Sequence, residues 1–350
     1  MRRLAPARGF PTREFEARLA RAQRFLAEAG AGACLLCTEP DVAYFTGLAS
    51  QFWHSPTRPI YVVLAARGLP IAVVPEILKN SMAQSSWVQD VRTWPAPVPA
   101  DDGVSLLSAA LREALSRSAA AAAHGGARRA VVALPMSLES QLRMPVADLD
   151  RLRADLGIRL VDAMPLIHGT RGVKSPLEQE KLRYACQTTS DAFEALPSVL
   201  RASSGIITER DVASRMRREL LRAGMDNAPY VIARSGQAGY NSIVDGPTDR
   251  VLRPGDVLAV DTGAVWDGYY ADFDRNFYVV DEDNEHAALP ADVALAHERL
   301  WMCTEAGIQA SVPGATMADV HGALKASLVA QGVGGSEIDA IMGCGRWGHG

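Results

Sequence analysis

The stretch that decides the fold is residues 257–277, which read VLAVDTGAVWDGYYADFDRNF. Its first part is an apolar strand that ends on Asp261, and two glycines then bracket a reversal of the chain. On the returning strand, residues two apart share a face, so Asp272, Asp274 and Asn276 point the same way. The stretch therefore predicts a hairpin that presents several carboxylates on one side.

Carboxylates gathered in this way favour a metal site, because a carboxylate that leaves an apolar strand is costly to bury uncompensated and several of them repel one another. A divalent cation, or a pair of cations that share bridging carboxylates, removes that cost. Oxygen ligands suit manganese, magnesium or zinc, and an added imidazole moves the choice toward the transition metals. The alternative from spacing alone is that the aspartates cap turns or pair with Arg275 and Arg250.

Upstream of the hairpin, short apolar runs alternate with amphipathic patterns. The predicted strands are residues 33–37, 60–65, 71–75, 131–134 and 158–161. The predicted helices are residues 13–29, 104–117 and 145–156. This alternation predicts an α/β domain with a largely parallel sheet.

A boundary follows at residues 163–175, and the second half opens with a clear helix start. Ser175 is suited to the N-cap, Pro176 to the first helical position and Glu178 to the third, which together make a capping box. The helix runs toward residue 200, where Pro197 is expected to bend or end it.

The rest of the second half has a different character. Further predicted helices cover residues 208–224, 291–310 and 316–330, and the predicted strands are residues 229–233, 256–262 and 269–280. Helices that precede a sheet with an antiparallel hairpin predict an α+β domain.

Composition narrows the class of protein. The chain has 350 residues, is 48% hydrophobic and carries a formal net charge of −4, which fits an ordinary globular protein and argues against a nucleic-acid partner. No apolar run approaches the roughly 20 residues that span a bilayer, and no apolar stretch follows Arg2 and Arg3, so we expect neither a membrane segment nor a signal peptide. Five cysteines do not suggest a disulfide framework, so we expect a reducing, cytoplasmic location.

The aspartate frame resembles the dinuclear pita-bread metallohydrolases, which include methionine aminopeptidase, aminopeptidase P, prolidase and creatinase. Asp272 follows Asp261 by eleven positions within it. Three further segments resemble that family in the same order along the chain: EPDVAYFTG at 39–47, VKSPLE at 173–178 and GRWGHG at 345–350. The chain looks most like the bacterial Xaa-Pro peptidase branch.

The resemblance implies two domains. Residues 1–165 would form an α/β, ribonuclease-H-like N-terminal domain of the creatinase type. Residues 172–350 would form an α+β pita-bread catalytic domain, incomplete at its C-terminus because the family places two glutamate ligands downstream of its metal histidine and this sequence has one residue there.

The resemblance also implies a metal site. Asp261 would be a ligand to one metal, Asp272 a bridge between two, and His349 the imidazole ligand. The cofactor would be two divalent ions (manganese, zinc, cobalt or iron), which lower the pKa of a bridging water and polarise the scissile carbonyl. With three of the five usual ligands, this 350-residue chain is expected to bind metal poorly and to be inactive.

The catalytic and substrate-binding residues are less well marked. Peptidases of the family carry a histidine just before the first aspartate strand, whereas residues 240–248 read YNSIVDGPT, so Tyr240, Asn241 and Asp245 are the candidates in its place.

The aromatic loop at residues 51–58 resembles a region that reaches into the partner subunit's site, which implies a homodimer and makes Trp53 and His54 candidate substrate contacts. Ordinary loop packing is the alternative.

These observations favour a metal-dependent hydrolase of a small peptide-like amide, most nearly an Xaa-Pro peptidase. The missing histidine keeps open a non-peptidase relative, such as a creatinase- or ectoine-hydrolase-like enzyme or a lyase, and the missing glutamates keep open a metal-free binding module. Aspartic proteolysis through the Asp261-Thr262-Gly263 triplet needs a second such triplet, in the same chain or across a dimer, and this chain holds one.

Overall fold

The computed structural model describes residues 3–55, 58–119, 130–138, 140–203, 205–237, 244–281 and 288–338. They belong to two compact units that the chain enters more than once. The first unit comprises Met1–Ser204, Asp211–Ile232 and Asp261–Asp274, and the second comprises Gly205–Arg210, Ala233–Val260 and Arg275–Gly350.

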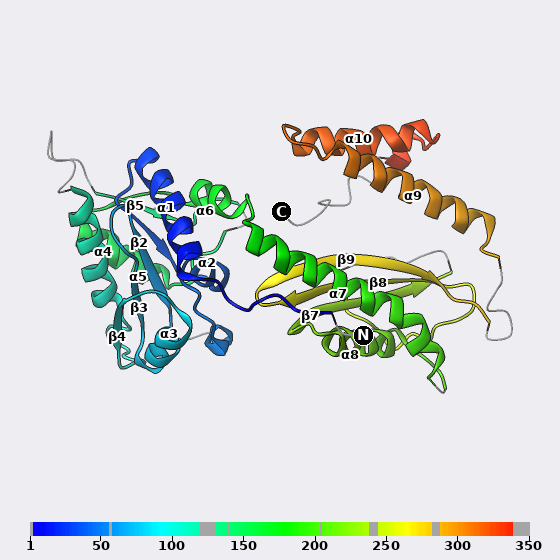
Figure 1. The fold of residues 1–350 in the computed structure, drawn as a ribbon, viewed down its shortest axis with the longest axis horizontal. Helices are drawn as coiled ribbons and strands as arrows, with labels where there is room; N and C mark the ends of the chain where they lie inside the picture. Colours follow the sequence, from blue (N-terminus) through cyan, green and yellow to red (C-terminus); the bar gives the residue numbers. More distant parts are fainter. Residues whose placement is uncertain are drawn as a thin grey trace. The chain divides into compact units, whose positions relative to one another are not determined.

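The first unit contains a six-stranded sheet with strand order β4-β3-β2-β1-β5-β6 (Figure 1). Its strands are β1 (Ala33–Leu36), β2 (Tyr61–Ala65), β3 (Ile71–Pro75), β4 (Asp90–Trp94), β5 (Val131–Leu134) and β6 (Arg159–Asp162). The sheet is mixed rather than largely parallel, since β1–β2 and β2–β3 pair antiparallel while the other three pairs are parallel. The connection between β2 and β3 is too short for the crossover that a parallel pair requires.

Both faces of this sheet are covered, which explains why its central strands β1, β2 and β3 are apolar throughout, whereas the edge strands β4 and β6 carry charged residues. The helices that pack on one face are α1 (Thr12–Glu28), α2 (Glu39–Thr46), α3 (Lys79–Ser85) and α6 (Met164–Arg171) (Figure 1). The helices on the other face are α4 (Val104–Ala119) and α5 (Val146–Leu156). Alternate residues of β2 supply the two sides, so Val62 belongs to one core and Val63 to the other.

Helix α7 (Pro176–Arg201) confirms the predicted capping box. The backbone N–H of Glu178 donates to the Ser175 hydroxyl at 3.3 Å, and the Ser175 N–H donates to the Glu178 carboxylate at 2.8 Å. Pro197 lies inside the helix and does not end it. Helix α8 (Glu209–Ala223) follows.

A three-stranded sheet has the order β7-β8-β9, with β7 (Asn227–Gly236), β8 (Val257–Trp266) and β9 (Tyr269–Tyr278). Asp267 and Gly268 make the two-residue turn between β8 and β9, with φ of 48° and 82°, which are the positive values that a type I′ turn requires. The predicted hairpin is therefore confirmed. Gly263, which was expected to open the reversal, instead lies inside β8, because this strand continues to Trp266.

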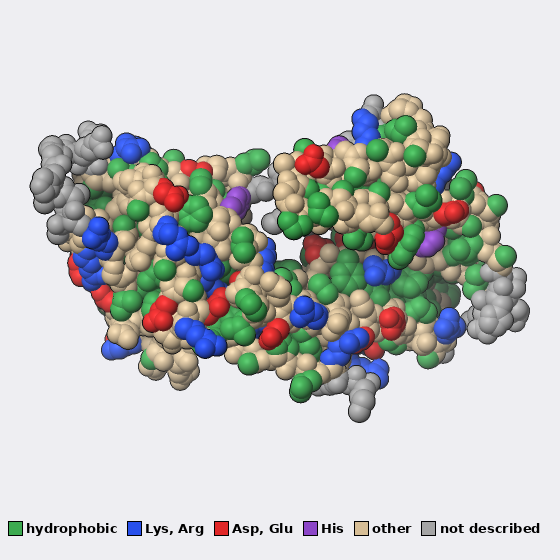
Figure 2. All heavy atoms as spheres, turned by 45° about the horizontal axis from the view of Figure 1, so that its top comes forward, with side chains coloured by type: hydrophobic (Ala, Val, Ile, Leu, Met, Phe, Trp, Pro, Cys, Tyr) green, Lys and Arg blue, Asp and Glu red, His purple; other side chains and the backbone are tan. Residues whose placement is uncertain are grey.

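The second unit contains a helical hairpin of α9 (Ala291–Ala310) and α10 (Met317–Ala330), with a small apolar core around Cys303 and Leu328. Apolar side chains such as Trp301, at 62% exposure, also lie on its surface, where Figure 2 shows hydrophobic groups in green. Among the described residues, no helix is long and apolar enough to cross a membrane.

Candidate metal centre

The register of the β8–β9 hairpin places the aspartates on one face of the sheet. The turn pairs Trp266 with Tyr269, and at the far end the Val279 N–H donates to the Asp256 carbonyl at 2.9 Å, which is the same register. Between these ends, residues facing one another across the strands include Asp261 with Asp274 and Gly263 with Asp272. All of these point to the same side, and Asp261 and Asp272 are diagonal neighbours.

Tyr230 of β7 contacts this acidic face. Its hydroxyl donates to Oδ1 of Asp272 at 2.5 Å. Its ring lies against Gly263, where an added Cβ would come within 2.2 Å of ring carbon Cε1, so the close approach requires glycine. Burial raises the pKa of Tyr230, and the hydrogen bond to Asp272 and the charges of Asp272 and Asp261 raise it further. Tyr230 therefore stays protonated and donates to the carboxylate.

Tyr230 is missing from the residues that the sequence singled out. Its role depends on how β7 pairs with β8, and the two strands are separated by a long connection. The one available signal was Gly263, because a glycine inside a strand often marks the close approach of another group.

The described carboxylates are of a type that binds divalent cations, but they do not by themselves form a complete metal site. Carboxylate oxygens suit hard and borderline divalent ions, and two of the three predicted ligands, Asp261 and Asp272, share one face of the sheet. Among the residues that the structure describes, no group of three or more histidine, cysteine, aspartate or glutamate side chains could hold a metal ion. The third predicted ligand, His349, lies outside the described residues.

The other predicted site residues lie elsewhere. Asp245 is exposed and belongs to the second unit, while Tyr240 and Asn241 lie outside the described residues. Trp53 is 8% exposed and packs in the core of the six-stranded sheet, with the Arg143 guanidinium 5.5 Å from its ring centroid. Its neighbour His54 is exposed. The packing of Trp53 favours the loop-packing alternative for that residue, and substrate contact stays a prediction.

A buried ion pair joins the six-stranded part of the first unit to α7 and β9. The side chains of Arg18 and Glu178 are 1% and 2% exposed, and their charged atoms lie 3.4 Å apart. The Arg18 guanidinium also lies 4.1 Å from the ring centroid of Tyr44, and the Tyr269 hydroxyl donates to Glu178 at 2.9 Å. Glu178 thus caps α7 and holds the first residue of β9.

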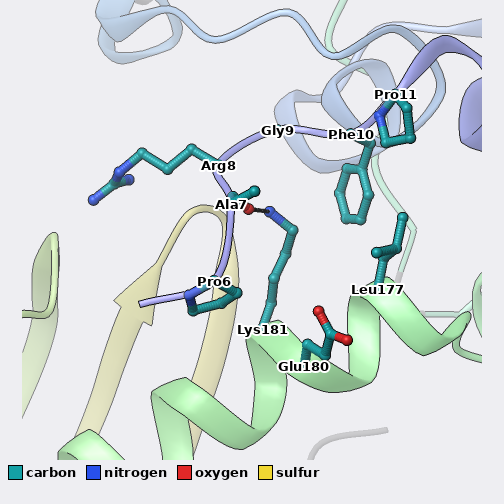
Figure 3. A pocket seen from close by; sticks show the side chains of 9 residues that line it. All are labelled: Pro6, Ala7, Arg8, Gly9, Phe10, Pro11, Leu177, Glu180 and Lys181. Atoms are coloured by element: carbon teal, nitrogen blue, oxygen red, sulfur yellow. Dashed lines mark hydrogen bonds between the residues drawn. The ribbon is translucent and has the colours of Figure 1, made fainter. Parts of the chain in front are cut away.

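The N-terminal segment adds a second connection to α7 (Figure 3). The ammonium of Lys181, a buried residue, donates to the Ala7 carbonyl at 2.9 Å and to the Asp267 carboxylate. It also lies 4.4 Å from the ring centroid of Phe10. The cavity that this segment lines with α7 has a volume of about 290 Å³, and none of the predicted site residues lines it.

Comparison with known families agrees with this architecture. Residues 18–173 match the Creatinase/Prolidase N-terminal domain, and residues 180–350 match Metallopeptidase family M24. The chain therefore belongs to metallopeptidase family M24, a family of hydrolases, and joins a creatinase-type N-terminal domain to a pita-bread domain. The resemblance inferred from residues 257–277 is confirmed.

Individual relatives are similar to this chain over most of its length. It is 28% identical over 331 residues to the probable dipeptidase PepE of Mycobacterium tuberculosis (strain ATCC 25618 / H37Rv), covering 93% of this chain and 78% of the relative. The crystal structure of dipeptidase PepE from Mycobacterium ulcerans is similar with a TM-score of 0.73 and 28% identity, over 93% of this chain and 78% of that one. The prolidase from Pyrococcus horikoshii OT3 has the same fold, with a TM-score of 0.68 and 17% identity over 90% and 78% of the two chains.

Proposed function

We propose that this protein is a metal-dependent peptidase of short peptides, and that its preferred substrates are Xaa-Pro dipeptides. The observation that carries the proposal is the acidic face of the β8–β9 hairpin, on which Asp261 and Asp272 are diagonal neighbours, in a chain that belongs to a metallopeptidase family. The relatives named dipeptidase and prolidase support a short peptide as the substrate.

In this proposal Asp261, Asp272 and His349 hold two divalent ions, of manganese, zinc, cobalt or iron. When bound, the metal supplies a Lewis acid for the peptide carbonyl and lowers the pKa of a bound water. The chain's own contribution at this face is orientation. Tyr230 holds one oxygen of Asp272 and so fixes the direction in which the carboxylate presents the other.

The domains in this proposal are residues 1–165 and 172–350.

We also propose a cytoplasmic homodimer in which Trp53 and His54 contact substrate in the partner subunit. Of the described cysteines, Cys34, Cys37, Cys186 and Cys303 are free thiols, which is in keeping with a reducing compartment.

A second candidate function is favoured by residues 240–248, which contain no histidine. We propose as the alternative a non-peptidase relative of the same fold that acts on a small amide, as creatinase does, or a lyase. A metal-free binding module is the remaining alternative.

The test is manganese binding and hydrolysis by the purified chain. We expect electron paramagnetic resonance to detect Mn²⁺ binding that Asp272→Asn abolishes and that Asp292→Asn, on the exposed first turn of α9, leaves unchanged. With saturating Mn²⁺, an Xaa-Pro dipeptide is expected to be cleaved faster than an Xaa-Leu dipeptide or creatine. Mn²⁺ binding that Asp272→Asn leaves unchanged would refute the metal site. Creatine cleavage without dipeptide cleavage would favour the non-peptidase alternative.

A further inference from the structure

Glu209 is a buried carboxylate that the candidate metal centre does not use. It is the first residue of α8 and is 1% exposed. Its Oε1 accepts hydrogen bonds from the backbone N–H and the hydroxyl of Ser235, at 2.8 and 2.9 Å. Its Oε2 accepts from the N–H and the hydroxyl of Thr248, at 3.1 and 2.7 Å. Both oxygens are thus held by two donors each, which is an unusually complete set for one side chain.

The two donor residues lie on either side of the first part of the connection between β7 and β8. Ser235 is the last residue but one of β7, and Thr248 lies within the connection, nine residues before β8 begins at Val257. Because one rigid carboxylate accepts from both, it holds the place where the chain leaves β7 close to the place where it returns. The described part of this connection includes Asp245, the candidate in the position of the family's histidine.

Arg250 extends the same network to the start of β8. Its guanidinium donates to the Ser235 hydroxyl at 2.6 Å and to both oxygens of Asp256 at 2.7 and 2.8 Å. Asp256 is fully buried and accepts a further hydrogen bond from the Arg253 N–H at 2.8 Å. Arg250 therefore binds the buried carboxylate of Asp256 directly, and the Ser235 hydroxyl connects Arg250 to the buried carboxylate of Glu209.

The carboxylate of Glu209 does more than the helix terminus alone does. The first two amides of α8 donate to the carbonyls of Arg250 and Thr248, both at 3.0 Å, and these bonds hold only the returning segment. The Glu209 side chain adds the bonds to Ser235 at the end of β7, beside the Arg250–Ser235 bond and a bond from the Arg234 guanidinium of β7 to the Gly246 carbonyl at 3.4 Å. Burial by itself raises the pKa of the Glu209 carboxyl, but its hydrogen bonds to Thr248 and Ser235 outweigh burial, so the pKa is lowered and the group stays charged.

We propose that Glu209 is a positioning residue, whose buried carboxylate fixes the end of β7 and the segment 244–250 as one unit and so sets the placement of Asp245. The consequence for catalysis rests on the proposed function and on the expectation that Asp245 takes the place of the family's histidine. The local ordering does not depend on that function.

Hydrogen exchange tests the ordering directly. In Glu209→Gln, the side-chain NH₂ group faces N–H and hydroxyl groups that are themselves donors, so hydrogen bonds are lost. We therefore expect the backbone amides at 235–237 and 244–252 to exchange at least tenfold faster, with exchange in the strands of the six-stranded sheet unchanged. The matched control is Glu219→Gln, in the same helix, which is expected to leave both regions unchanged. Unchanged exchange at 235–237 and 244–252 would overturn the proposal, and so would acceleration spread evenly over the whole chain.

Variants of one donor residue, Thr248, provide the same test even if Glu209→Gln fails to fold. Thr248→Val removes the hydroxyl donor and is expected to give an intermediate acceleration, at least threefold, whereas Thr248→Ser keeps it and is expected to restore wild-type exchange. A serine variant as fast as the valine variant would show that the hydroxyl bond to Glu209 does not hold the segment.

Kinetics separate the positioning role from the proposed function. With Mn²⁺ and an Xaa-Pro dipeptide, Thr248→Val is expected to raise KM at least threefold with kcat within twofold of the wild type, and Thr248→Ser to restore KM. If wild-type protein cleaves no dipeptide, the proposed function fails while the exchange result still decides the role of Glu209. If cleavage occurs and KM does not move, Asp245 is not positioned for substrate by this contact.

Discussion

The two sheets of this protein are made from strands of opposite character. The six-stranded sheet has helices on both faces, and its central strands are buried along their whole length. The three-stranded sheet buries residues such as Val260 and Trp266 and turns Asp272 and Asp274 of β9 to an exposed face. The first sheet thus supplies stability, and the second keeps one face for polar chemistry.

The difference teaches where to look for function in a two-sheet protein. A strand that is covered on both sides has no position at which a charged group avoids burial, so its side chains are confined to packing. A strand with one open face can carry carboxylates on alternate residues at little cost, since water reaches them.

The largest effect that tests this comparison is the loss of a core side chain. Leu35 of β1 is 1% exposed, and Leu35→Ala is expected to lower the free energy of unfolding by about 2–5 kcal/mol, because it removes buried apolar contacts and leaves a cavity. Tyr270→Ala, at a residue of β9 that is 53% exposed, is expected to change it by less than about 0.5 kcal/mol. Chemical denaturation measures both, and equal losses would contradict the contrast between the sheets.

A smaller effect is expected from adding one methyl group to the acidic face. Gly263→Ala places a Cβ within 2.2 Å of the Tyr230 ring, so the ring must move away from Asp272 at a cost of about 1–3 kcal/mol. The control is Gly246→Ala, which meets no atom within 4 Å. If thermal denaturation shows the two alanine variants to be equally stable, Tyr230 does not pack on Gly263 as described.

The hydrogen bond on that face is expected to contribute less. Tyr230→Phe keeps the ring and removes the donor to Asp272, at a cost of about 0.5–1.5 kcal/mol at neutral pH. The pKa of Tyr230 is raised on folding, so its contribution is complete below the ordinary value of 10 and is lost as the pH rises through the raised pKa. Denaturation at several pH values should therefore show that the difference in the free energy of unfolding between wild type and Tyr230→Phe becomes smaller in strong alkali. A difference in the free energy of unfolding that stays constant with pH would contradict the hydrogen bond from Tyr230 to Asp272.

The smallest effect is expected on the acid side. Folding lowers the pKa of Glu209, so its charge contributes stability above the ordinary value of 4.5 that is lost as the pH falls through the lowered pKa. The difference in denaturation midpoint between wild type and Glu209→Gln should then shrink as the pH is lowered below 4.5. A difference that grows on acidification would show that the carboxyl is protonated in the folded protein.

Much of the fold could be predicted from the sequence because it depends on local rules. The capping box of Ser175 and Glu178 marks the start of α7, and glycine at the β8–β9 turn marks the hairpin, since both are decided within a few residues. The antiparallel pairing of β1 with β2 was not predicted, because strand direction depends on the path of the intervening chain rather than on strand composition.

The candidate site also contains residues that could be predicted from the sequence and one that could not. The alternation of side chains along a strand was enough to put Asp272 and Asp274 on one face, and the family resemblance added Asp261 as a ligand. Tyr230 could not be found in this way, because its contact with Asp272 depends on the pairing of β7 with β8, which are distant in sequence.

By itself, the sequence determined the family, the hairpin and the face that carries the aspartates, because periodicity, turn chemistry and motif order are properties of neighbouring residues. Only the tertiary structure decided that Tyr230 holds Asp272 and that Glu209 joins Ser235 to Thr248. Those contacts close loops between residues tens of positions apart, and no local preference specifies which partners meet once the strands pair and the helices pack.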